Sequence, residues 1–164
     1  MEITTELIKE LRDMTGVSVM QCKKALEEAG GDKEKAVAIL QAKSADIASK
    51  KGDRTLAAGV VSSYIHATGT VGTMVELLCE TDFVAQNEEF KKMARDIAMH
   101  IAAANPRFLK LEDVTEGGEP EDVLLNQPFI KNPEITILSL IQRAVQKFGE
   151  NIEISRFTRY SVSK

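Results

Sequence analysis

The sequence lacks tryptophan, and aromatic residues make up only 5% of its 164 residues. It contains two cysteines, which are too few for a disulfide framework and favour a reducing compartment. No run of about 18 apolar residues occurs, and charges interrupt the first apolar stretch every few positions. We therefore expect neither a signal peptide nor a membrane span, and we expect a soluble, cytoplasmic protein.

A strong excess of either charge is also missing. Lys and Arg number 21 and Asp and Glu number 25, which gives a net charge of -4. Because phosphate neutralisation needs basic residues, this balance argues against a general nucleic-acid binder. Hydrophobic residues reach 43%, so a packed core is expected, built mainly from aliphatic and methionine side chains.

Recognisable catalytic and metal-binding motifs are absent as well. The sequence has no phosphate-binding loop, no G-x-G-x-x-G after a strand, no nucleophile elbow and no H-E-x-x-H. His66 and His100 fall on different predicted elements, and no Cys/His cluster has metal-ligand spacing. Cys22 and His100 could form a nucleophile–base pair, but Cys22 lies on an apolar helix face, where cysteine is usually inert. We expect no enzyme activity, no metal and no cofactor, and favour a protein that acts by binding.

The first 50 residues predict three short helices. Gly16 and the pair Gly30-Gly31 end the first two, Ser18 and Gln21 match a capping box, and Asp32 is an N-cap. Each segment has apolar residues at helical spacing, namely Leu7, Ile8, Leu11 and Met14, then Cys22, Ala25, Leu26 and Ala29, then Ala36, Leu40 and Ile47. These patterns predict a three-helix bundle over residues 1–50, with a thin core and marginal stability on its own.

A charged connector occupies residues 43–54 and extends to about residue 58. Its charges are Lys43, Lys50, Lys51 and Arg54 against Asp46 and Asp53. The connector could contact an acidic partner or RNA. With so few charges, however, a solvated helix end and linker is the favoured interpretation.

Residues 59–164 predict an α+β domain. Alternation before and after a turn at residues 68–70 predicts a β-hairpin, whose second strand places Val71, Thr73, Val75, Leu77 and Cys79 on one face. Asn87 caps a helix that ends at Asn105-Pro106 and buries Phe90, Met93, Ile97, Ile101 and Ala104. Residues 112–122 hold six acids and no base, and predict a solvated loop.

The last part of the chain predicts one more helix and one more strand. The helix turns Ile137, Ile141, Ala144, Val145 and Phe148 inward and stops at Gly149. In the strand, Ile152, Ile154, Thr158, Tyr160 and Val162 alternate, with Arg156 and Arg159 along it. Together with the hairpin this predicts a small antiparallel sheet covered by helices on one face.

The most informative segment is residues 76–86, which leave a strand, turn at Thr81-Asp82 and place Phe83 just before the next helix cap. The residue pattern alone favours a hydrophobic staple, in which Phe83 packs into the core against the first helical turn. The alternative is an acid and an aromatic displayed side by side on a rigid strand–helix corner. That combination suits a protein interface, where the aromatic fills a pocket and the carboxylate forms hydrogen bonds.

Four separated stretches carry a family resemblance: residues 11–26, 81–84 within 76–86, 97–106, and 127–129 with 149–152. In this order they resemble the elongation factor Ts family over nearly the whole chain. Four matches in order are far more specific than any one of them. The sequence departs at Val19, Gln21, Leu78 and Gln86, where Met, an acid, Asn and a base are common in the family.

The resemblance implies a guanine-nucleotide exchange factor that binds elongation factor Tu and promotes GDP release by perturbing its magnesium and phosphate site. It implies that the helical bundle, similar to ubiquitin-associated domains, docks on the partner's G domain. Asp82 and Phe83 would then insert near the partner helices that border the phosphate site. It implies no direct nucleotide binding, no nucleic acid and no membrane.

The implied partner-binding residues are Thr81, Asp82, Phe83 and Val84 at the corner, Met20, Lys23 and Lys24 on the bundle, and His100. The three bundle residues fall off the apolar stripe of their helix. The ordinary interpretation of the two lysines is solvated charge, and that of His100 is a half-buried, hydrogen-bonded histidine. Some short members of the family work as homodimers, and the resemblance suggests the same here, since a terminal strand at the sheet edge could pair with its mate. Arg156 and Arg159 could instead protect that edge.

Two other functions remain open from the sequence. An adaptor similar to ubiquitin-associated domains would bind peptides through residues 1–50, but it leaves Asp82 and Phe83 unexplained. A ribosome- or RNA-associated protein would act through residues 43–54 and would bind RNA with a steep salt dependence.

Overall fold

The computed structural model describes residues 2–50 and 56–163, with side chains in the third helix described as far as Asp46. The chain divides into two compact units. The helical unit comprises Met1–Arg54 and Gln142–Asn151, and the sheet unit comprises Thr55–Ile141 and Ile152–Lys164. The mixture of helices with a small antiparallel sheet confirms the predicted α+β class. No helix in the described residues is long and apolar enough to cross a bilayer.

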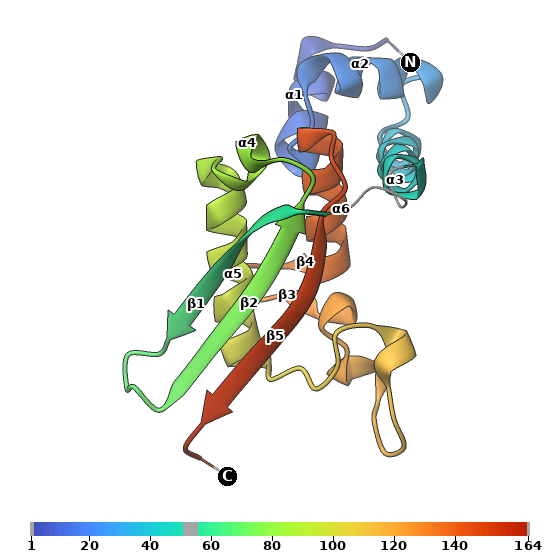
Figure 1. Cartoon of the computed structure of the whole chain (residues 1–164). Coiled ribbons are helices and arrows are strands. Elements are labelled where there is room, and N and C mark those ends of the chain that lie inside the picture. The colour runs from blue at the N-terminus through green and yellow to red at the C-terminus, as the bar shows by residue number, and fades with distance from the viewer. Residues whose placement is uncertain (1, 51–55, 164) are drawn as a thin grey trace. The chain divides into compact units, whose positions relative to one another are not determined.

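The helical unit begins with α1 (Thr5–Thr15), α2 (Val19–Glu28) and α3 (Lys33–Lys50), which confirm the three predicted helices (Figure 1). Gly16 ends α1 in the left-handed conformation, at a φ of 69°, where glycine carries no steric penalty. The Ser18 side chain accepts a hydrogen bond from the backbone N–H of Gln21 and caps α2. The core consists of Leu11, Val17, Cys22, Ala25, Leu26, Ala36 and Leu40.

Three details of the helical unit refine the predictions. Met14, which continues the apolar spacing of α1, is 42% exposed. The predicted inward side chain of Ile47 and residues 51–54 of the charged connector lie outside the described residues. Residues 142–148 of α6 (Ile137–Phe148) belong to this unit, where the buried Ser44 hydroxyl donates to Gln146 Oε1 at 3.1 Å.

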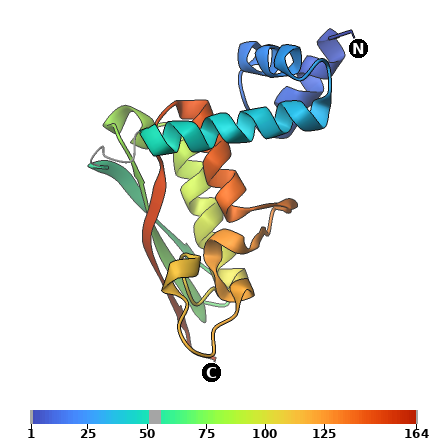
Figure 2. The same ribbon diagram turned by 90° about the vertical axis from the view of Figure 1, so that its right-hand side faces the viewer.

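The sheet unit is built on three antiparallel strands in the order β1-β2-β5. The predicted hairpin is confirmed as β1 (Ala58–Ile65) and β2 (Val71–Cys79), and the predicted terminal strand as β5 (Glu153–Ser161), at a sheet edge. Figure 2 shows α5 (Glu88–Ala104) along one face of the sheet. On that face Thr73, Val75, Leu77 and Cys79 of β2 are buried, as predicted. From α5, Phe90, Met93, Ile97 and Ile101 are buried as predicted, but Ala104 is exposed.

Between α5 and α6 the chain forms short elements that the sequence pattern does not reveal. They are three 3₁₀ turns, at Leu111–Asp113, Pro120–Asp122 and Leu124–Asn126, and a small hairpin of β3 (Pro128–Phe129) and β4 (Asn132–Thr136). These strands are too short for alternation to be visible and begin with Pro or Asn, which are rare in strands.

A β-bulge at Ser155 changes the face that β5 presents. Leu77 pairs with Ile154, whereas Glu76 pairs with Arg156, so Ser155 is the extra residue. The sequence predicted one continuous alternation, which would put Ile154 and Tyr160 on the same face. That prediction is wrong, because the extra residue leaves Ile154 buried and Tyr160 75% exposed.

The bulge also turns Arg159 toward α5, where its guanidinium donates two hydrogen bonds to the carbonyl of Ala102, at 3.1 and 3.3 Å. Arg159 therefore does not protect the sheet edge, as one interpretation of the sequence suggested. Arg156 stays on the outer face and lies 3.3 Å from the carboxylate of Glu76.

Candidate partner-binding site

The corner after β2, formed by Thr81, Asp82, Phe83 and Val84, connects a strand to a helix (Figure 1). A single-turn helix, α4 (Asp82–Ala85), lies here between the end of β2 and the start of α5. The Thr81 side chain caps this helix by accepting a hydrogen bond from the Val84 N–H at 3.4 Å. Four residues are far too few for a stable helix in isolation, so the surroundings must hold α4 in place.

Phe83 is 88% exposed on this corner, whereas Val84 and Ala85 beside it are 6% and 0% exposed. Successive helical residues point about 100° apart, so a single turn can anchor one side and display the other. The core interpretation of Phe83 as a hydrophobic staple is therefore wrong. Its ring is available in full to another molecule, and burying it would contribute about 1.5–3 kcal/mol.

The other residues predicted at the corner differ in solvent exposure. Thr81 and Asp82 are exposed, and the Asp82 carboxylate lies in the first turn of α4, where the helix dipole favours negative charge. Val84 is buried, so its side chain anchors the corner from below. Asp82 and Phe83 thus form the displayed pair that the second interpretation required.

The bundle residues singled out from the sequence are also exposed. Met20 is 69% exposed on α2, next to Val19 at 53%. Lys23 and Lys24 face solvent, and Lys23 lies 3.9 Å from Glu27, a solvated pair that contributes little stability. This part of α2 combines an apolar surface with two positive charges, as a docking surface would.

His100 differs from the other predicted site residues, because its ring is buried in the sheet unit with 1% exposure. The backbone N–H of Ile130 donates to Nδ1 at 3.2 Å, so that nitrogen carries no proton. Nε2 must then carry it, and it donates to Gln127 Oε1 at 3.0 Å. Burial lowers the pKa of His100, and the bond to Gln127 opposes this shift. The neutral ring ties α5 to the segment before β3.

This arrangement predicts an acid-sensitive contribution to stability. Since the pKa of His100 is lowered in the folded state, the unfolded chain binds the extra proton. The contribution is therefore complete above the ordinary pKa of about 6.5 and declines as pH falls below it. In urea unfolding between pH 7.5 and 5, His100→Gln should lose less stability on acidification than the wild type. Parallel curves for His100→Gln and the wild type would contradict the prediction.

The structure also bears on the nucleophile–base hypothesis. Cys22 is fully buried in the core of the helical unit, where its Sγ donates to the Val17 carbonyl at 3.6 Å. Burial raises the pKa of this thiol. Both ring nitrogens of His100 are bonded to Gln127 and Ile130 instead. The Cys22–His100 pair is wrong, because each side chain is occupied within its own unit.

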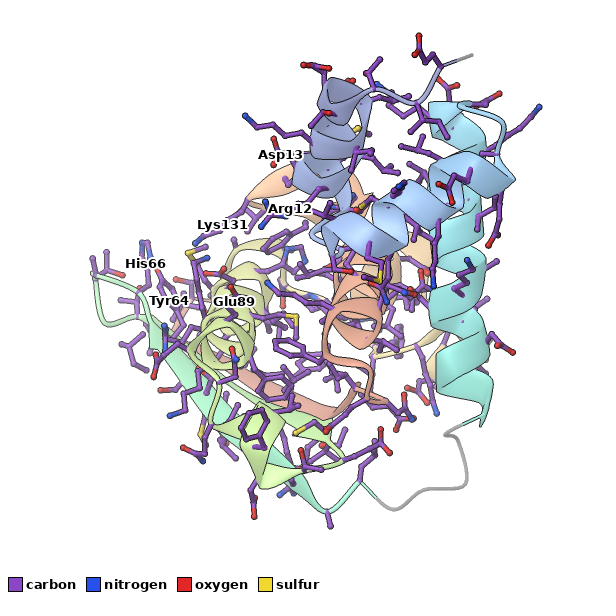
Figure 3. All side chains as sticks on the ribbon, turned by 90° about the horizontal axis from the view of Figure 1, so that it is seen from above. Arg12, Asp13, Tyr64, His66, Glu89 and Lys131 are labelled. Carbon is purple, nitrogen blue, oxygen red and sulfur yellow. The ribbon has the colours of Figure 1, made fainter. Side chains whose placement is uncertain are left out.

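The second histidine has a different setting. Figure 3 shows Tyr64 and His66 side by side near the end of β1, and Tyr64 Oη lies 3.2 Å from His66 Nδ1. Across the part of the chain that the structure describes, no group of three or more His, Cys, Asp or Glu could hold a metal ion.

Sequence reasoning missed one surface, the outer face of the sheet. Its exposed apolar side chains come from all three strands and from the residue after β5: Val61, Ile65, Met74, Tyr160 and Val162, with exposures of 49–77%. Met74 and Thr158 pair directly, and a shallow groove runs along these residues toward Val162. The alternation in β1 hinted at this surface, but the bulge that brings Tyr160 onto it left no signal in the sequence.

An α+β protein that displays an aromatic side chain on a braced corner, with an exposed helical face, fits the class of proteins that act by binding other proteins. The sequence model of the elongation factor TS family matches residues 23–118. Elongation factor Ts of Carboxydothermus hydrogenoformans is 44% identical over 195 aligned positions, covering 99% of this chain and 90% of the relative.

Elongation factor Ts of Thermodesulfovibrio yellowstonii is also 44% identical, covering 100% of this chain and 98% of the relative. That of Desulforamulus reducens is 41% identical, covering 99% and 90%. The chain belongs to the elongation factor Ts family and is a translation elongation factor of protein biosynthesis. Because the aligned spans exceed the 164 residues of the chain, these relatives carry additional residues within the match.

Proposed function

We propose that this protein is a cytoplasmic guanine-nucleotide exchange factor that binds elongation factor Tu and accelerates GDP release. It acts by protein binding and not as an enzyme that makes or breaks covalent bonds. Family membership and the exposed Phe83 on its braced corner support this proposal, and the exposure of Phe83 is the observation on which it mainly depends. The ring enters the partner beside the helices that border its magnesium and phosphate site, with Asp82 as the polar neighbour.

The energetics favour a wedge that acts together with a second contact. A GTPase holds its nucleotide through a phosphate loop and a coordinated Mg²⁺. A protein that shifts the loop and the ion therefore weakens nucleotide binding without contacting the nucleotide. Each tenfold gain in release needs about 1.4 kcal/mol of differential binding energy. Phe83 can supply about 1.5–3 kcal/mol, so a larger effect requires the bundle as well. By reciprocity, GDP must weaken binding of this protein by the same factor.

The residues take three different parts in this proposal. Thr81, Asp82 and Phe83 contact the partner, and Val84 anchors them to the sheet unit. Met20, Lys23 and Lys24 dock the helical unit on the partner's G domain. His100, which is buried, contributes by fixing α5 and the segment before β3.

The test is the release of fluorescent GDP from elongation factor Tu. A trace of this protein, well below the partner concentration, should accelerate release in the presence of free nucleotide, because one molecule serves many partners in turn. Unchanged release, even with this protein in excess, would refute the proposal. RNA binding that falls steeply with added salt would favour a ribosome- or RNA-associated protein, and binding of peptides through residues 1–50 alone would favour an adaptor.

We also propose that two copies of the chain associate through the outer face of the sheet. The side chains at the hairpin end of this face are all uncharged, namely Ser63, Ile65, Met74, Thr158, Tyr160 and Val162. The charged pair Glu76–Arg156 lies in the next row, beside Val61. In a two-fold interface the same patch meets itself, so a charged patch would repel its own copy and an apolar one would not. The edge position of β5 also permits strand pairing, but face-to-face packing buries far more of this apolar surface.

A further inference from the structure

Cys79, the last residue of β2, connects the strand to the turn that displays Phe83. Its side chain is fully buried, and its thiol donates a hydrogen bond to the carbonyl oxygen of Thr81 at 3.2 Å. The same oxygen accepts the backbone N–H of Ala85 at 3.2 Å, the bond that closes the first turn of α4. One carbonyl therefore joins the end of the strand to the start of the helix.

Two further hydrogen bonds of the corner lie within α4 and its caps. The Thr81 hydroxyl accepts from Val84, and the Asp82 carbonyl accepts from the Gln86 N–H at 2.9 Å, so both bonds lie within the helix and its caps. They form α4 without setting its direction relative to β2. The burial of Val84 and Ala85 presses α4 against the unit, but apolar packing is not directional. A hydrogen bond from β2 to Thr81 supplies a direction.

We propose that Cys79 is a positioning residue for Phe83, because its thiol fixes the Thr81 carbonyl and with it the angle at which the corner displays the phenyl ring. This inference rests on the proposed exchange function and deepens it. Phe83 acts efficiently as a wedge only if the corner presents its ring in one orientation. A mobile ring would have to be ordered on binding, and this ordering costs free energy. Loss of the thiol therefore loosens the display of Phe83 without removing Phe83.

The alternative is that Cys79 is only a small apolar side chain that fills space under α4. The two roles separate in a matched pair of variants. Cys79→Ala and Cys79→Ser both remove the sulfur and reduce the volume, but only serine keeps a donor that can reach the Thr81 carbonyl. Val75→Ala, at another buried position of β2, serves as a control that removes core packing far from the corner.

The experiment measures GDP release from elongation factor Tu over a range of factor concentrations, which separates the maximal rate from the half-saturating concentration. For each variant the melting temperature is measured in parallel. Cys79→Ala should lower the maximal rate about three- to tenfold, as expected for the loss of one hydrogen bond. Cys79→Ser should remain within about twofold of the wild type, and Val75→Ala should lose melting temperature while keeping the maximal rate.

Each other outcome overturns the inference in its own way. Equal rates for Cys79→Ala and the wild type would mean that the thiol does not position Phe83. Equal losses for the alanine and serine variants would assign Cys79 to packing alone, as would a Val75→Ala rate that falls in proportion to its stability. If the wild-type protein itself leaves GDP release unchanged, the proposed exchange function fails, and the variants are not needed to show it.

Discussion

Phe83→Ala should slow GDP release from elongation factor Tu roughly ten- to hundredfold at a fixed concentration of the factor, with little change in its own melting temperature. The first effect follows from losing about 1.5–3 kcal/mol of ring burial in the complex. The second follows from the 88% exposure of the ring, since removing an exposed side chain leaves no cavity. Stopped-flow fluorescence of labelled GDP and thermal circular dichroism measure the two quantities.

A matched control makes this result specific. Phe90 lies on α5 a few residues beyond the corner and is fully buried. Phe90→Ala should therefore cost about 3–5 kcal/mol of folding stability, the usual result of deleting a core aromatic. If Phe83→Ala melted several degrees lower, as Phe90→Ala must, Phe83 would contribute to the fold in solution, and its proposed role as a wedge would lose its basis.

Met74→Asp should convert a homodimer of this chain into monomers. Met74 lies on the central strand in the middle of the outer face, and it is 49% exposed in the single chain. In a two-fold interface each copy would carry an unpaired carboxylate into apolar surroundings, facing its symmetry mate. We expect the dimer dissociation constant to rise at least about a hundredfold, which corresponds to about 2.7 kcal/mol. Sedimentation equilibrium over a range of concentrations measures it.

Leu111→Asp is the control for this experiment. Leu111 is 60% exposed in a 3₁₀ turn, away from the three strands, so the variant makes the same change in charge at another exposed apolar side chain. It should leave the dissociation constant unchanged. A wild-type protein that sediments as a monomer at all concentrations would disprove association through the sheet face, and an equal effect of both substitutions would place the interface elsewhere.

The elements that the sequence predicts well are those fixed by neighbouring residues. Gly16 ends α1 in the left-handed conformation, and Asn87 caps α5 through a 2.8 Å hydrogen bond to the Glu89 N–H. Both signals act within one helical turn, so the sequence contains them in full. The hairpin of β1 and β2 is equally local, because Gly69, at a φ of 72°, closes it over a short turn.

The features that depend on distant parts of the chain were harder to predict. Whether Phe83 packs inward depends on how α4 is anchored, and that is decided by the burial of Val84 and Ala85. The bulge at Ser155 is a property of two paired strands, since its hydroxyl donates to the carboxylate of Glu76, which is 79 residues away in the chain. The residue pattern of one strand does not show in which register that strand pairs with its neighbour. The residues alone left two interpretations of Phe83 open, and the family resemblance favoured the one in which Asp82 and Phe83 contact a partner.

The bulge in β5 determines which side chains the outer face of the sheet presents to the proposed second copy. Deleting Ser155 would leave a regular strand in which Ile154 still faces inward and Tyr160 still faces outward. Regular pairing that retained Ser155 would instead turn Tyr160 toward α5 and bring Arg159 onto the open face. The patch would then carry a positive charge on each copy, although no residue on it had been substituted. The bulge alone, with no substitution on the patch, therefore decides whether a charge would lie in the proposed contact between two copies, and a comparison of aligned contact residues would overlook it.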